Sequence, residues 1–228
     1  MNKTIAALMM GTGLFLAPAM ASAHISVSGT GFANSTQEFS FNVGHGCAGA
    51  DTYSVKMEIP AGVTSVRPMQ SDFGRVSVEK NAAGDVISIT WQKADADVFA
   101  SDISYYKLAV RLKVPNAPFT TVYFPTYQTC KAADGTISTT NWVGTPTSQA
   151  AEPAPELRVL PARKPGWNKF TVPMAISDLS VYFSDAQIVW KGTAAYSANP
   201  ATAELATATS GVTALTSLQA NDEIWVKY

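Results

Sequence analysis

Histidine is almost absent from this sequence, which contains only His24 and His45 among its 228 residues. Methionine forms no cluster after residue 23, so the sequence gives no sign of the thioether site that Cu(I) prefers. No P-loop, Gly-x-Ser-x-Gly or His-Glu-x-x-His motif occurs, which argues against the enzyme classes that use them. An excess of charge is also lacking, with 16 basic and 17 acidic residues, so binding to nucleic acid or to an anionic membrane surface is not predicted.

Long apolar segments are lacking too, apart from the uncharged run at residues 5–16. Lys3 precedes this run, and the small residues Ala21-Ser22-Ala23 follow it. This layout is typical of a secretory signal peptide, whereas a membrane anchor would need a longer run to span about 30 Å of hydrocarbon. We therefore predict that residues 1–23 are a signal peptide cleaved after Ala23, and that the chain is exported to the periplasm with His24 as its first residue.

Cysteine is nearly as scarce as histidine, with Cys47 and Cys130 as the only pair. In an oxidising compartment two cysteines most simply form one disulfide, which would constrain the unfolded chain. The alternatives are a thiolate metal site or a nucleophile. Export and the lack of a Cys-x-x-Cys motif favour the disulfide.

Alternating apolar and polar residues are abundant, as expected for strands with one buried face. Turn residues such as Pro60-Ala61-Gly62 and Asp134-Gly135 separate the alternating runs. Several short strands at this spacing predict an all-β fold, an antiparallel β-sandwich of the immunoglobulin or cupredoxin type. The predicted strands cover residues 38–43, 53–59, 75–78, 85–91, 105–114 and 120–127.

Prolines divide the predicted sandwich domain, residues 24–145, from the rest of the chain. Residues 146–166 contain five prolines, which lack a backbone donor, so we expect a linker or surface strap without a central strand. Residues 167–228 are predicted to form a small β-rich extension with strands at 185–192 and 223–228. The extension has no titratable cluster, which favours a packing or docking role.

The two histidines have the spacing of two strands joined by a loop. If His24 begins the first strand and His45 follows the second, an antiparallel hairpin brings them together. A terminal histidine offers its α-amino group and its imidazole Nδ1 to one metal ion, and a second imidazole would complete a histidine brace for Cu(II). The alternatives are a solvated terminus for His24 and a turn histidine bound to backbone for His45.

Four stretches of the sequence match a known pattern: His24-Ile25-Ser26-Val27, residues 43–63 with Gly44-His45-Gly46-Cys47, residues 122–142, and a tail at 185–228. They resemble the YcnI-like (DUF1775) family of bacterial periplasmic copper-binding proteins, and the tail is similar to that of a proteobacterial branch. The resemblance implies a β-sandwich, copper held at the terminal histidine, and a role in copper trafficking, storage or homeostasis. A protein that stores or delivers copper is expected to show no turnover. Because the C-terminal extension has no chemistry of its own, we expect it to dock a partner such as a copper transporter or chaperone.

Residue by residue, the family's terminal histidine matches His24, and its tryptophan near copper matches Trp142. Family members use a carboxylate from the loop after the second strand, where this sequence has Gly44-His45-Gly46. We therefore expect His45 to replace the carboxylate; Asp51 is the alternative donor, although a turn role for it is favoured. The acidic run Asp95, Asp97 and Asp102 is interpreted as a solvated loop.

Two other functions stay open on the sequence alone. Polysaccharide monooxygenases also use a histidine brace, although Trp142 beside the metal would argue for a closed site. A metal-free structural or interaction β-sandwich would make both histidines incidental.

Overall fold

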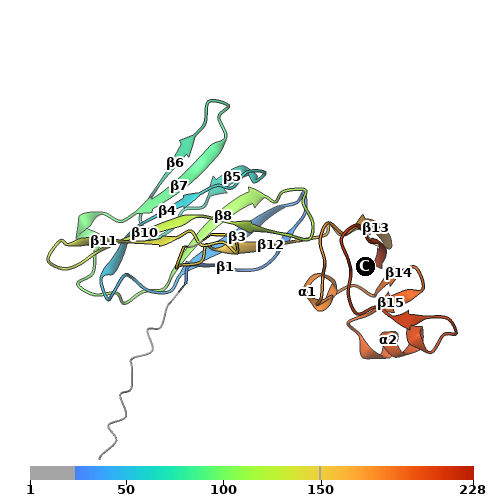
Figure 1. Ribbon diagram of the computed structural model, residues 1–228. Helices are drawn as coiled ribbons and strands as arrows, with labels where there is room; N and C mark the ends of the chain where they lie inside the picture. Colours follow the sequence, from blue (N-terminus) through green and yellow to red (C-terminus); the bar gives the residue numbers. More distant parts are fainter. Residues whose placement is uncertain (1–23, 149) are drawn as a thin grey trace, which may run out of the picture.

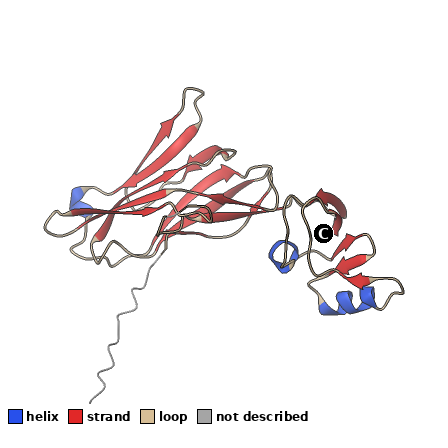
Figure 2. Cartoon of the chain, in the orientation of Figure 1, coloured by secondary structure: helices blue, strands red, loops and turns tan. Residues whose placement is uncertain are grey.

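Strands are far more abundant than helices in the computed structural model, which describes residues 24–148 and 150–228 (Figures 1 and 2). The predicted signal peptide therefore lies outside the described residues. Within them, no helix is both long and apolar enough to cross a membrane.

Two antiparallel sheets form the larger unit. The first has the order β1 (Ser26–Val27), β3 (Thr36–Val43), β8 (Tyr106–Lys113), β5 (Thr64–Pro68). The second has the order β11 (Ile137–Trp142), β10 (Thr126–Lys131), β4 (Asp51–Glu58), β7 (Val86–Gln92), β6 (Arg75–Lys80). A short 3-10 helix, η1, spans Asp95–Asp97.

The alternation read from the sequence explains this architecture. Phe39, Phe41 and Val43 of β3 are buried, as are Val55 and Met57 of β4, and all five belong to one core. Because these residues come from both sheets, the core lies between two facing layers. The predicted all-β sandwich is confirmed.

A third sheet corrects two predictions. Its order is β2 (Gly31–Phe32), β12 (Glu156–Leu160), β9 (Thr120–Tyr123). The expectation that residues 146–166 contain no central strand is wrong, because β12 is the middle strand, with Leu157 and Val159 fully buried. The prolines nearest to it, Pro155 and Pro161, flank these five residues and leave all their backbone donors available.

The single strand predicted at residues 120–127 is two strands. Tyr123, the last residue of β9, pairs with Glu156, whereas Thr126, the first of β10, pairs with Met57 in another sheet. Pro125 between them has no backbone donor to continue a ladder, so the chain changes sheets there.

The C-terminal unit is a five-stranded sheet with two short helices. Its strand order is β13 (Trp167–Thr171), β17 (Glu223–Lys227), β14 (Ile188–Lys191), β15 (Ala194–Tyr196), β16 (Thr213–Ala214). Helix α1 spans Ser180–Phe183 and α2 spans Pro200–Thr207. The predicted β-rich extension is present, with strands at both expected places.

The joint between the two units consists of aromatic rings and one arginine. Phe119, just before β9, is fully buried in the core of the C-terminal unit, and its ring centroid lies 5.4 Å from that of Tyr182 and 5.9 Å from that of Phe183. The guanidinium of Arg163 lies over the rings of Phe32 and Tyr228, at 4.2 and 5.3 Å. Burial at this joint raises the pKa of Tyr228 to about 12. The units therefore pack together through shared side chains.

Candidate metal centre

His24 lies at the edge of the sandwich, one residue from its core. The adjacent Ile25 is 3% exposed and packs in the core, whereas His24 itself is exposed. Strand β1 pairs antiparallel with β3, with Ser26 opposite Asn42. Continued by two residues, this register sets His24 beside Gly44, the residue before His45. The predicted antiparallel arrangement of the two segments is thus present.

Trp142 is the aromatic side chain next to His24. The two ring centroids are 5.7 Å apart, with the ring planes inclined by 57°. Trp142 is 3% exposed and ends β11, the edge strand of the second sheet. The family resemblance matches Trp142 to a tryptophan near the metal, and in the structure Trp142 contacts His24.

His45 sits in the loop that follows β3 and leads to Cys47. Its Nδ1 lies 2.5 Å from the carbonyl oxygen of Gly46. Because a carbonyl only accepts hydrogen bonds, Nδ1 carries the hydrogen, and a neutral His45 then has its lone pair on Nε2. Metal-binding histidines commonly donate their other ring N–H to a backbone carbonyl in this way.

A disulfide anchors the His45 loop to β10. Cys47 and Cys130 are bonded, with their Cα atoms 5.7 Å apart. The predicted disulfide is confirmed, and the alternatives of a thiolate site or a cysteine nucleophile are excluded because the bond uses both thiols. The loop that carries His45 is therefore tied to the second sheet.

Gln128 links the histidine loop to the tryptophan. It is 2% exposed, and its Nε2 donates to the carbonyl oxygen of His45 at 2.6 Å and to Oγ1 of Thr52 at 2.9 Å. Its Oε1 accepts from Nε1 of Trp142 at 3.1 Å. One buried amide thus fixes both the His45 backbone and the indole that contacts His24.

Asp102 fixes the loop from the other side. Its Oδ2 accepts from the backbone N–H of Gly46 at 2.5 Å. Its Oδ1 is buried and makes no hydrogen bond to any residue that the structure describes. Asp95 and Asp97 are exposed, as expected for a solvated loop, whereas Asp102 is half-buried and contacts the His45 loop, 56 residues away in sequence.

A pocket of about 750 Å³ opens between these elements. Its lining includes His45, Asp102, Gln128, Trp142 and Glu152. Sequence reasoning missed Gln128 and Glu152, and neither carries a motif that would have singled it out. His24 is not among the lining residues, so the His24–Trp142 contact borders the pocket from outside.

Asp51 is buried elsewhere in an ion pair. Its Oδ2 lies 2.5 Å from Nζ of Lys93 and 2.9 Å from the backbone nitrogen of Phe99, and its Oδ1 accepts from the Tyr106 hydroxyl at 3.2 Å. Asp51 is fully buried and begins β4, so its favoured interpretation as a turn residue is wrong. With its carboxylate in these contacts, we do not retain Asp51 as a metal donor.

Among residues 24–148 and 150–228, no three His, Cys, Asp or Glu side chains are grouped so that they could hold a metal ion. Any site built on His24 and His45 therefore depends on nitrogen donors from two side chains and the main chain. This is the donor set of a histidine brace, in which the terminal amine is the third nitrogen.

Replacing Gln128 with leucine is expected to lower the free energy of unfolding by about 2–5 kcal/mol. The variant leaves the buried Trp142 N–H and the half-buried His45 carbonyl without their partner; an unsatisfied buried group costs about 1–3 kcal/mol, and the partly exposed carbonyl costs less. Urea unfolding measures the loss, and Gln92→Leu, at an exposed position of β7, is the matched control. A Gln128→Leu variant as stable as the control would mean that the amide does not hold the site together.

Comparison with known proteins gives one family and a structural likeness. A family profile described as a domain of unknown function (DUF1775) matches residues 24–159. A solved structure of an uncharacterized protein from Nocardia farcinica, described as having an immunoglobulin-like fold, is 22% identical over 61% of this chain and 99% of its own, with a TM-score of 0.49. The search of curated proteins gives no match. Because the profile covers more than half of the sequence, the chain belongs to the DUF1775 family.

Proposed function

We propose that this protein binds Cu(II) in the periplasm through His24 and His45 and serves copper trafficking, storage or homeostasis. The main support for the proposal is the contact between His24 and Trp142, whose ring centroids are 5.7 Å apart. Gln128 in turn links Trp142 to the backbone of His45 through hydrogen bonds to both. Both histidines of the chain thus belong to one connected edge of the sandwich.

His24 supplies two of the proposed nitrogen donors. Once the bond to Ala23 is cleaved, the α-amino group and the imidazole Nδ1 can close a chelate ring on one metal ion. An α-amino group has a reference pKa near 8, so a metal ion can displace its proton at neutral pH. Removal of the signal peptide is then an activating step, because the uncleaved peptide bond blocks the amine.

His45 supplies the third nitrogen through Nε2. The Nδ1 contact with the Gly46 carbonyl orients the ring, and the disulfide at Cys47 and the Asp102 contact at Gly46 restrict the loop. A loop held at the two residues that follow His45 loses little conformational entropy on metal binding, which raises affinity.

Trp142 covers one side of the proposed site. Its ring lies beside His24 and is almost fully buried, so it excludes water from that side and keeps the His24 imidazole near the sandwich. A covered metal face suits a protein that stores or delivers copper. We propose no turnover, and a copper transporter or chaperone is the partner expected to receive or supply the ion.

Cu(II) titration followed by electron paramagnetic resonance tests the proposal. The chain beginning at His24 should bind one Cu(II) with a nitrogen-rich signal. A chain with one extra alanine before His24 should lose at least about 100-fold in affinity, because the amine is then an amide. His45→Ala should keep a weaker site with fewer nitrogen couplings.

The control for both variants is the far-ultraviolet spectrum and urea midpoint of the metal-free protein, which should not change. Binding that is indifferent to the extra alanine would contradict the brace and favour a metal-free interaction sandwich. Rapid oxidation of an added polysaccharide with reductant and peroxide would instead favour a copper monooxygenase.

A further inference from the structure

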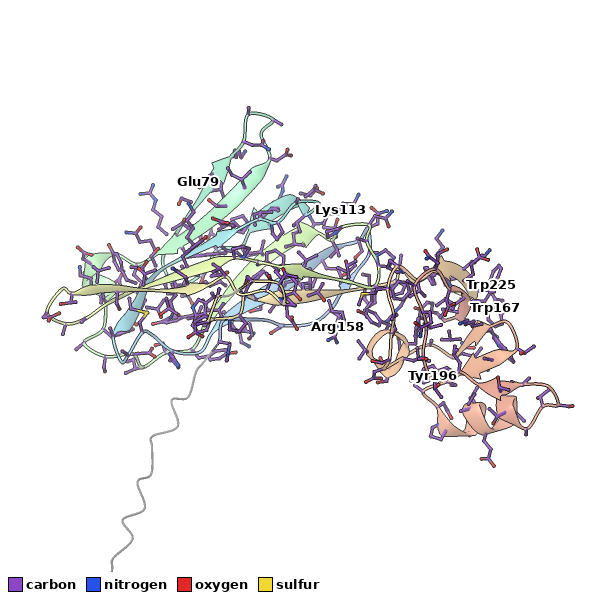
Figure 3. The ribbon with its side chains drawn as sticks, viewed as in Figure 1. Glu79, Lys113, Arg158, Trp167, Tyr196 and Trp225 are labelled. Carbon is purple, nitrogen blue, oxygen red and sulfur yellow. A yellow bond between two sulfur atoms is a disulfide. The ribbon has the colours of Figure 1, made fainter. Side chains whose placement is uncertain are left out.

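Three of the five tryptophans in the chain lie on one face of the C-terminal sheet. Trp190 of β14 pairs with Trp225 of β17, and Trp167 of β13 pairs with Lys227, which places it diagonally next to Trp225. Paired residues in antiparallel strands share a face of the sheet. We call this surface the tryptophan face; Figure 3 labels Trp167 and Trp225 on it.

The tryptophan face points away from the core of its unit. Ile224 and Val226, which alternate with Trp225 along β17, are fully buried, whereas Trp225 is 49% exposed and Trp167 is 52% exposed. About half of each indole therefore rests against the sheet while the other half is open to solvent. Large exposed apolar side chains that are grouped together mark an interaction surface.

Charged groups of both signs lie between the indoles. Lys169 pairs across the strands with Trp225, and its Nζ lies 2.8 Å from Oε1 of Glu223. Lys227 occupies the position opposite Trp167. The face thus combines flat apolar rings with hydrogen-bond donors and acceptors, and it has no strong excess of one charge.

The mixture of indole rings and charged side chains on the tryptophan face favours one class of ligand over the others. A lipid bilayer would have to take up the Lys169–Glu223 ion pair together with the indoles, which is costly in a medium of low dielectric constant. A polyanion would need a large surplus of cations, whereas Lys169 and Lys227 on this face exceed Glu223 by a single charge. A neutral glycan presents C–H faces that can stack on the indoles, and hydroxyl groups that can bond to the lysines and the glutamate.

We propose that the tryptophan face binds a neutral polysaccharide, with Trp167 and Trp225 as stacking platforms and Lys169 and Glu223 as hydroxyl contacts. The proposal is independent of copper. It would hold the protein on a glycan surface by its C-terminal unit and leave His24, on the other unit, available.

Co-sedimentation with insoluble cellulose and chitin, and native electrophoresis in gels containing dextran, test the proposal with residues 24–228 in the presence of EDTA. At least one of these glycans should retain the protein. Trp167→Ala and Trp225→Ala should each weaken binding roughly 10-fold, and the double variant should not bind measurably. Leu205→Ala, an exposed apolar position on α2, is the matched control and should bind normally.

Circular dichroism of the double variant checks that the sheet stays folded. The proposal is overturned if none of the three glycans retains the wild type, or if the double variant binds as well as the control. Retention by phosphatidylcholine vesicles without retention by a glycan would assign the face to lipid. A dimer in sedimentation that dissociates in the double variant, without glycan binding, would assign it to a second copy.

Discussion

The Lys93→Met substitution is expected to lower the free energy of unfolding by about 3–5 kcal/mol, because it leaves the buried Asp51 carboxylate without its countercharge. Lys93 is 4% exposed and Asp51 is fully buried, with Nζ and Oδ2 2.5 Å apart. The ammonium also lies over the rings of Phe99 and Tyr106, at 4.9 and 4.6 Å from their centroids, and these contacts disappear with it.

Urea unfolding of the single variant and of Asp51→Leu with Lys93→Met measures this effect. The double variant should regain most of the loss, since replacing both partners of a buried ion pair removes the unpaired charge. The control is Lys56→Met at the exposed pair with Glu79, where no measurable change is expected. A single variant as stable as that control would show that the buried pair contributes nothing.

Removal of the disulfide is expected to destabilise the protein by a similar amount. Cys47 and Cys130 are 83 residues apart, and closing a loop of that length in the unfolded chain contributes about 4–5 kcal/mol in the chain-entropy model. The paired substitution Cys47→Ser with Cys130→Ser should therefore show that loss in urea unfolding, and also a lower Cu(II) affinity if the proposed site is correct.

The wild type treated with reductant is the comparison for the serine pair, and the two should unfold at the same urea concentration. A loss below about 1 kcal/mol in both would mean that the unfolded chain is already compact around this loop. Unchanged Cu(II) affinity in the serine pair would show that the hydrogen bonds of Gln128 and Asp102 suffice to hold the His45 loop.

Long strands with regular alternation could be predicted from the sequence, whereas β12 could not, although its residues Glu156-Leu157-Arg158-Val159 also alternate. β3, β4 and β8 carry apolar residues at every second position, whereas β12 has only five residues between prolines. Helix α2 had a readable signal in Asn199-Pro200, where the Asn199 side chain accepts from the backbone nitrogens of Ala201 and Thr202. The Thr-rich and Ala-rich composition that follows obscured it.

The residues of the candidate site also differ in whether the sequence alone could identify them. The disulfide could be predicted, and His24 and His45 could be selected as candidate ligands, because their residue types are rare in this chain. Gln128 and Asp102 are common polar residues whose role depends on contacts 83 and 56 residues away in sequence. Only the pairing of β10 with β4 and the return of the 95–104 segment bring them to the His45 loop.

Phe119 has a place in the fold that depends on the second unit. Its backbone adopts a φ of 66°, a strained conformation for an aromatic residue, and its ring is fully enclosed by the C-terminal unit. A relative that ends where the family match ends, at residue 159, would leave such a ring in water. In those lineages selection should favour a small or polar residue, or glycine, at this position. The residue at this position should therefore differ between relatives that carry the second unit and relatives that lack it.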